Sequence, residues 1–110
     1  MMQFVTYVPV RFNDGSPVPK SDLMSIVNRF CEKFGGASVV GPVQGHWIDG
    51  DSGLSYSDES LRIEVACSND QYAEAEEFVL QIGREFQQEA MYFEVRYFDG
   101  VRILKVPPGD

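Results

Sequence analysis

Apolar and polar residues alternate along the first readable segment, QFVTYVPVRF at positions 3–12. The segment is also rich in β-branched and aromatic residues, and this combination predicts a β-strand. From Leu23 the apolar positions recur at i, i+3, i+4, i+7, i+8 and i+11, which is typical of one face of a helix. This helix should begin near Pro19 and end at Gly35, where glycine provides a left-handed cap.

Two extended segments follow and predict a hairpin. ASVVGPVQGHWID, at 37–49, contains Pro42, which has no N–H to donate, so this strand should lie at a sheet edge or carry a bulge. GDSG is typical of a turn, and LSYSDESLRIEVAC supplies the partner strand. In the partner, Leu61, Ile63, Val65 and Cys67 share one face.

A second helix should start at Ser68, which forms a capping box with Gln71. Its apolar stripe is Tyr72, Ala75, Val79, Ile82 and Phe86, with Phe78 beside it.

The last third, AMYFEVRYFDGVRILKV, carries the strongest turn signal of the chain at Asp99–Gly100. A two-residue turn there sets a register in which apolar residues face each other and an acid faces a base. The expected pairs are Phe98 with Val101, Val95 with Leu104, Glu94 with Lys105 and Phe93 with Val106.

The element order β-α-β-β-α-β predicts an α+β fold, a single ferredoxin-like domain over residues 1–110 with a C-terminal hairpin strand. Two helices would cover one face of an antiparallel sheet. The other face is expected to be apolar and to pair with a second copy in a homodimer. Residues expected on that face are Tyr92, Phe98 and Ile103, with some of Val5, Tyr7 and Val39.

The net charge is −8, and residues 49–99 hold 13 acidic and three basic side chains. Such a surface disfavours direct DNA or RNA binding. The ordinary explanation of such an acidic surface is that it keeps the protein soluble. The alternative is an acidic inhibitor that mimics nucleic acid and docks on a basic protein, with Asp70, Glu74, Glu77 and Glu85 in one stripe.

The cysteines and the N-terminus predict a soluble cytoplasmic protein. Cys31 and Cys67 fall in apolar runs and are expected as buried thiols in a reducing compartment, although a disulfide between them stays open. We see no signal peptide and no apolar run long enough for a membrane span, so no membrane partner is expected.

Few residues are candidates for chemistry. One His and two distant cysteines do not supply a usual zinc set, and phosphate-binding glycine motifs are absent, so no metal and no cofactor are expected. His46 could act as a general base with Asp49, Glu59 or Glu89. The competing interpretation is that Trp47 fills the core, His46 points to solvent and the acids nearby form a turn.

The segment FQQEAMYF, at 86–93, is the second candidate region. Gln88 could join Trp47 in the wall of a small ligand pocket. Alternatively, a polar side chain there satisfies backbone groups at the helix end.

GHWID, then DES, and later EFQQEAMYFEV resemble a small uncharacterised bacterial family of ferredoxin-like proteins. The matching positions are Gly45, Trp47, Glu59, Gln88 and Glu89, and the likeness spans about half the chain. The resemblance implies the same fold and carries no assigned activity.

These observations favour a non-catalytic interaction or regulatory domain. The first alternative is a small enzyme or ligand-binding protein of the dimeric α+β barrel type. A cavity beside His46 would favour that alternative.

Overall fold

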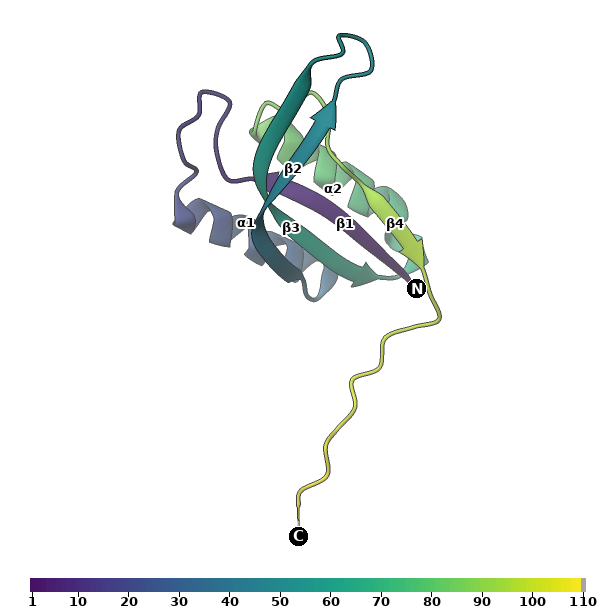
Figure 1. Ribbon diagram of the computed structural model, residues 1–110. Helices are drawn as coiled ribbons and strands as arrows, with labels where there is room; N and C mark the ends of the chain where they lie inside the picture. Colours follow the sequence, from purple (N-terminus) through teal and green to yellow (C-terminus); the bar gives the residue numbers. More distant parts are fainter. Residues whose placement is uncertain (110) are drawn as a thin grey trace.

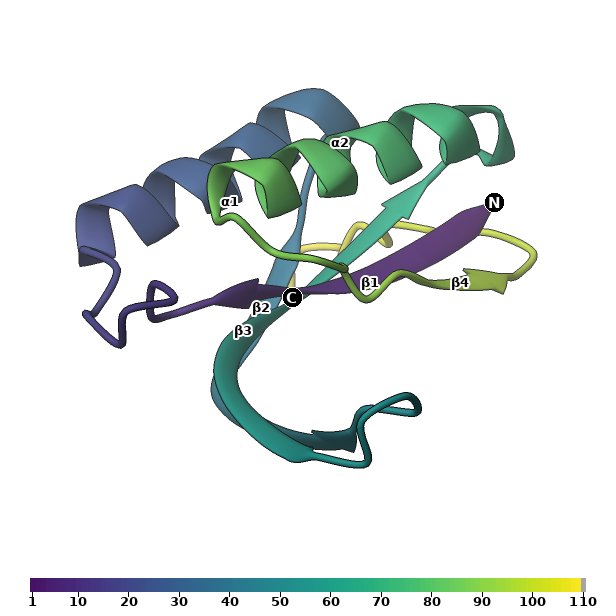
Figure 2. The same cartoon turned by 90° about the horizontal axis from the view of Figure 1, so that it is seen from above.

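The structure, a computed structural model, describes residues 1–109. A four-stranded antiparallel sheet has the order β2-β3-β1-β4, and both helices lie over one face (Figures 1 and 2). This arrangement confirms the predicted ferredoxin-like fold. The elements are β1 (Met2–Pro9), α1 (Lys20–Phe34), β2 (Ser38–Ile48), β3 (Ser55–Cys67), a 3-10 turn (Asn69–Gln71), α2 (Tyr72–Glu85) and β4 (Glu94–Tyr97).

The core lies between the helices and the central strands. Phe4 of β1 packs against Phe30 and Phe34 of α1, with ring centroids 6.3 and 5.2 Å apart. Phe78 of α2 completes this aromatic cluster against Phe30 at 4.9 Å. The predicted apolar faces of the two helices and of β3 therefore meet in one layer. Its buried members also include Met2, Val8, Ile26, Ile63, Val65, Cys67, Ala75, Val79, Ile82 and Phe86.

The helix boundaries follow the predicted caps. Gly35 adopts φ 91°, and its N–H donates to the Cys31 carbonyl at 2.8 Å, which closes α1. Ser68 Oγ accepts from the Asp70 N–H, while the Gln71 side chain accepts from the Ser68 N–H at 3.1 Å. This capping box is confirmed, although it begins the 3-10 turn that leads into α2.

The β2–β3 hairpin projects beyond the rest of the sheet. A register shift between Val40 and Val43 surrounds Pro42, as expected for a proline in an edge strand. Pairing of β1 with β3 stops at Pro9 and Ser60, whereas β2 and β3 remain paired as far as Ile48. The projecting part curls under the sheet on the side away from the helices (Figure 2).

The predicted C-terminal hairpin is wrong. β4 contains only four residues, and residues 98–109 form no regular element and run away from the body (Figure 1). Local turn chemistry favoured a fifth strand. However, a strand gains stability mainly from the layer it packs on, and the helices already cover the existing strands. Phe93 turns toward the core against Phe4, with ring centroids 5.5 Å apart, instead of pairing with Val106.

Candidate functional site

The open face of the sheet is more polar along β3 and β4 than the sequence predicted. Arg62 donates to Glu64 at 2.8 Å, and Arg96 donates to Glu94 at 2.7 Å. Val5 lies between Glu64 and Glu94 in the strand register and is only 1% exposed. The aliphatic stems of charged side chains can cover an apolar residue in this way. The prediction of an apolar open face is therefore wrong in this region.

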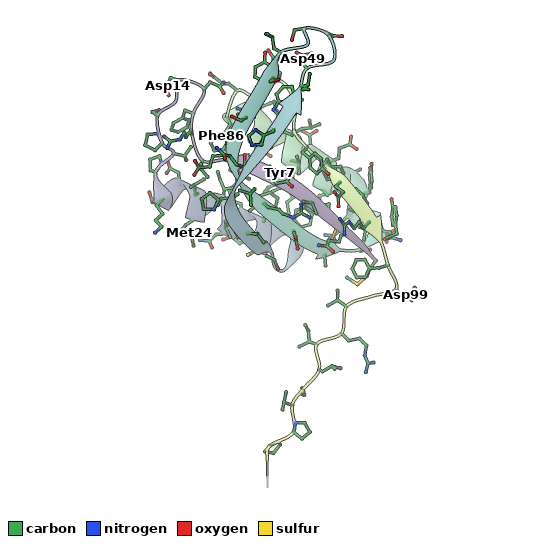
Figure 3. The ribbon with its side chains drawn as sticks, in the orientation of Figure 1. Tyr7, Asp14, Met24, Asp49, Phe86 and Asp99 are labelled. Carbon is green, nitrogen blue, oxygen red and sulfur yellow. The ribbon has the colours of Figure 1, made fainter. Side chains whose placement is uncertain are left out.

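A cavity of about 1040 Å³ lies on the open face, beneath the curled hairpin. Strands β1 and β3, together with Tyr92, form its floor, the hairpin forms one wall, and the loops at 10–19 and 86–91 close its rim. Tyr7 lies in the sheet near the base of the hairpin, and Asp49 marks the hairpin tip (Figure 3). The aromatic and polar side chains of the lining include Tyr7, Tyr92, Arg62, Trp47, Asp58, Asn13 and Gln88.

Two tyrosines and an arginine form the floor. Tyr7 and Tyr92 meet edge to face at 5.2 Å, and Arg62 Nη1 donates to the Tyr7 hydroxyl at 2.8 Å. The hydrogen bonds to Glu64 and Tyr7 raise the pKa of Arg62, so the guanidinium is always charged. The hydrogen bond to Glu94, at 2.7 Å, raises the pKa of Tyr92 and keeps its hydroxyl protonated. The floor thus presents a fixed cation beside the Tyr7 ring.

The hairpin wall carries the single tryptophan. Trp47 stacks on Tyr56, with ring centroids 4.6 Å apart and planes 20° from parallel, and its Nε1 donates to Asp58 at 3.2 Å. Trp47 is 51% exposed, so the interpretation that it fills the core is wrong. The physical reason is that this part of the hairpin extends past both β1 and the helices. One face of the indole remains available to a ligand.

The sequence candidates divide into those that line the cavity and one that does not. His46 and Glu59 both line it and are exposed, from opposite strands of the hairpin. The His46 side chain forms no hydrogen bond within residues 1–109. Glu89 is exposed and lies outside the lining. The backbone reverses direction just before it, at Gln87 with φ 53°.

Gln88 joins the two loops at the rim. Its Nε2 donates to Asn13 Oδ1 at 3.0 Å and to the Phe86 carbonyl at 3.1 Å. Asn13 in turn donates to the Gln87 carbonyl at 3.0 Å. Gln88 therefore satisfies a helix-end carbonyl and also lines the cavity, and its part in binding a ligand stays a prediction.

Sequence reasoning did not select Tyr7, Asn13 or Arg62 as site residues. These residues are far apart in the chain, and no local motif joins them. The only signal was the expected place of Tyr7 and Tyr92 on the open face.

The acidic stripe on α2 is largely paired. Glu74 contacts Lys33 at 3.4 Å, and Glu85 contacts Arg29 at 2.9 Å. Glu77 pairs with Arg84. These ion pairs reduce the net negative charge that a mimic of nucleic acid would need, and they disfavour that function.

The cysteines and the possible metal ligands add no further site. Cys31 and Cys67 are free, and burial, with the nearby Glu74 charge, raises the pKa of the Cys67 thiol. Within residues 1–109, no three His, Cys, Asp or Glu side chains come close enough together to hold a metal ion. None of the helices described is long and apolar enough to cross a membrane.

Comparison with known proteins finds likeness in structure alone. No known family and no curated protein matches the sequence. A phage SAM lyase in complex with S-methyl-5'-thioadenosine is similar, with 16% identity, a TM-score of 0.66, and coverage of 86% of this chain and 79% of that one. The resemblance to an uncharacterised bacterial family stays a prediction.

Two divalent cation tolerance proteins are similar as well. CutA1 of Thermus thermophilus shares 10% identity at a TM-score of 0.67, over 93% of this chain and 88% of that one. CutA1 of Ehrlichia chaffeensis shares 12% identity at 0.61, over 92% and 83%. At such low identities the likeness shows the fold alone: the chain is a small ferredoxin-like domain.

Proposed function

We propose that this chain is a non-catalytic binding domain for a small nucleoside-like ligand, held in the cavity between the open sheet face and the β2–β3 hairpin. The observation that carries the proposal is the convergence of aromatic rings and fixed polar groups from four separate segments on one cavity. Its volume, about 1040 Å³, is slightly above the range of about 300–1,000 Å³ found for small-molecule sites, so a small ligand would fit within it.

The aromatic residues suit a planar ring. Trp47 is backed by Tyr56 and offers its other face. Tyr7 and Tyr92 provide a second aromatic surface on the floor. Stacking on such rings contributes about 1–3 kcal/mol per base in nucleic-acid-binding proteins. A heterocyclic base is therefore the ring that this cavity would hold well.

The polar residues suit hydroxyl and amino groups. Asp58 and Glu59 on the hairpin can accept hydrogen bonds from ligand hydroxyls. Arg62 is held by Tyr7 and Glu64, so it loses little freedom when it donates to a ligand. The amides of Asn13 and Gln88 offer further donors and acceptors at the rim. A sugar joined to a base would use both sets of groups.

Structural likeness to the phage SAM lyase suggests a first probe. That protein was solved with S-methyl-5'-thioadenosine, a molecule with a base, a ribose and an apolar end. The shared fold does not carry its activity to this chain. It supports the choice of S-methyl-5'-thioadenosine and adenosine as test ligands.

The test is titration with both probes, followed by Trp47 fluorescence and by calorimetry. Because the chain has one tryptophan and it lines the cavity, a bound base should change its emission. Arg62→Gln should weaken binding by about tenfold or more, since a hydrogen bond from a charged group contributes about 1.5–3 kcal/mol. Arg84→Gln, on the outer side of α2, is the matched control and should bind as the natural chain does.

Two results would refute the proposal. One is that neither probe produces heat or a fluorescence change at millimolar concentration. The other is equal binding by the Arg62→Gln and Arg84→Gln variants, which would place the ligand elsewhere. Conversion of the bound probe to a new compound, seen by chromatography, would contradict the non-catalytic part.

A further inference from the structure

The chain after β4 exposes an unusually apolar segment. Val101, Ile103, Leu104 and Val106 are 51, 89, 69 and 89% exposed, although each belongs to a residue type that is normally buried. They occur within six consecutive residues, VRILKV at 101–106. A contiguous group of this kind usually marks a contact with another molecule.

The same six residues have the properties of a β-strand. Val101, Ile103 and Val106 are β-branched and Leu104 is apolar, which favours extended backbone. Gly100 precedes the segment, and Pro107 and Pro108 follow it. The prolines cannot donate to a ladder, so any strand formed here ends at Val106.

The sheet offers a free edge of matching length. β2 is the outermost strand, so the backbone groups on its outer side pair with no other strand among the described residues. Pro42 and the register shift beside it leave the stretch 43–48 as a regular edge of six residues. Trp47 and Ile48 in this edge are 51 and 70% exposed. A free, partly apolar edge of this kind is a template for another strand.

The charges of the two segments are complementary. The C-terminal segment carries Arg102 and Lys105 and no acid between 101 and 106. The hairpin carries Asp49, Asp51, Asp58 and Glu59, and it has no Lys or Arg between 43 and 60. Opposite charges in the two regions favour the encounter of two molecules and suppress wrong partners.

The segment cannot reach the β2 edge of its own molecule. Phe98 is the last residue tied to the sheet, through its N–H to the Met1 carbonyl, and only three residue steps separate it from Val101. Those steps span at most about 11 Å. A strand outside β2 lies four strand spacings from β4, about 19 Å, and 43–48 lies at the opposite end of β1 from Met1.

We therefore propose that residues 101–106 of one copy of this chain add as a strand to the β2 edge, residues 43–48, of a second copy. This places self-association at the sheet edge and the C-terminal segment, whereas the sequence suggested the open sheet face. The proposal does not depend on the ligand-binding function, and its test does not use a ligand.

The test compares molar mass in solution by sedimentation at about 50 µM, a working concentration within the micromolar range of moderate affinities. The natural chain of residues 1–110 should have at least twice the single-chain mass of 12.4 kDa. The variant Ile103→Asp with Leu104→Asp should dissociate, with a dissociation constant raised about 100-fold by the loss of two apolar contacts. The control Met24→Asp with Leu80→Asp changes two exposed apolar residues on the helices and should retain the larger mass.

Amide hydrogen exchange shows which segments of the chain form the contact between two copies. In the natural chain, amides in both 43–48 and 101–106 should exchange slowly, and both should exchange faster in the Ile103→Asp, Leu104→Asp variant. A mass of 12.4 kDa for the natural chain would overturn the proposal, whether or not 101–106 folds back on β4. An association that survives the double substitution would overturn it equally, because the contact would then lie elsewhere.

Discussion

Thr6 is the one buried hydroxyl that the fold leaves without a hydrogen bond among the described residues. It lies in the middle of β1, opposite Ile63, and is 0% exposed. Its Oγ1 has no partner within residues 1–109. Replacing it by valine keeps the β-branched shape and exchanges the hydroxyl for a methyl group.

We expect Thr6→Val to stabilise the protein. A buried hydroxyl without a hydrogen bond costs about 1–3 kcal/mol in proteins. The added buried methyl group contributes up to about 0.8 kcal/mol, less any cost of fitting it into a packed core. The free energy of unfolding should therefore rise by about 1–2 kcal/mol, which is about 4–8 °C or more in melting temperature.

Urea unfolding followed by circular dichroism measures this change, with the slope of the transition checked for constancy. Thr6→Ser is the matched control, since it keeps the hydroxyl and loses the methyl group, and it should destabilise by about 1 kcal/mol. A Thr6→Val protein less stable than the natural chain would refute the reasoning. It would mean that the hydroxyl is hydrogen-bonded in solution, for example to a buried water.

Two further predictions concern the hairpin and the open face. Trp47→Ala should lower the free energy of unfolding by no more than about 1 kcal/mol, because the ring is half exposed, whereas Phe30→Ala, at 0% exposure, should lower it by about 3–5 kcal/mol in the same urea assay. Equal losses would show that the hairpin packs on the core. The hydrogen bonds from Tyr92 and then from Arg96 lower the pKa of Glu94, so their stabilising effect is present at neutral pH and is lost as pH falls through the folded pKa, below the ordinary value of 4.5. Tyr92→Phe should move the pKa of Glu94 upward in a carboxyl NMR titration, and an unchanged titration would contradict this hydrogen bond.

Much of the candidate site depended on contacts that sequence patterns do not encode. GHWID drew attention to His46 and Trp47, and the segment after α2 drew attention to Gln88, because unusual residues stood out locally. His46, Trp47 and Gln88 line one cavity because the hairpin curls beneath the sheet. Figure 2 shows this course of the hairpin. Arg62 looked like an ordinary solvent-facing residue of an alternating strand. Its role follows from contacts with Tyr7, which lies 55 positions away in the chain.

The amino-acid sequence by itself determined the elements whose stability is local or periodic. The stripe of α1, its Gly35 cap, the Ser68 capping box and the alternation of β3 each depend on residues a few positions apart. Tertiary structure decided the exposure of Trp47 and the course of the chain after Tyr97. Those outcomes depend on whether other elements pack against the segment. The position of those elements is set by the whole fold and not by the local sequence.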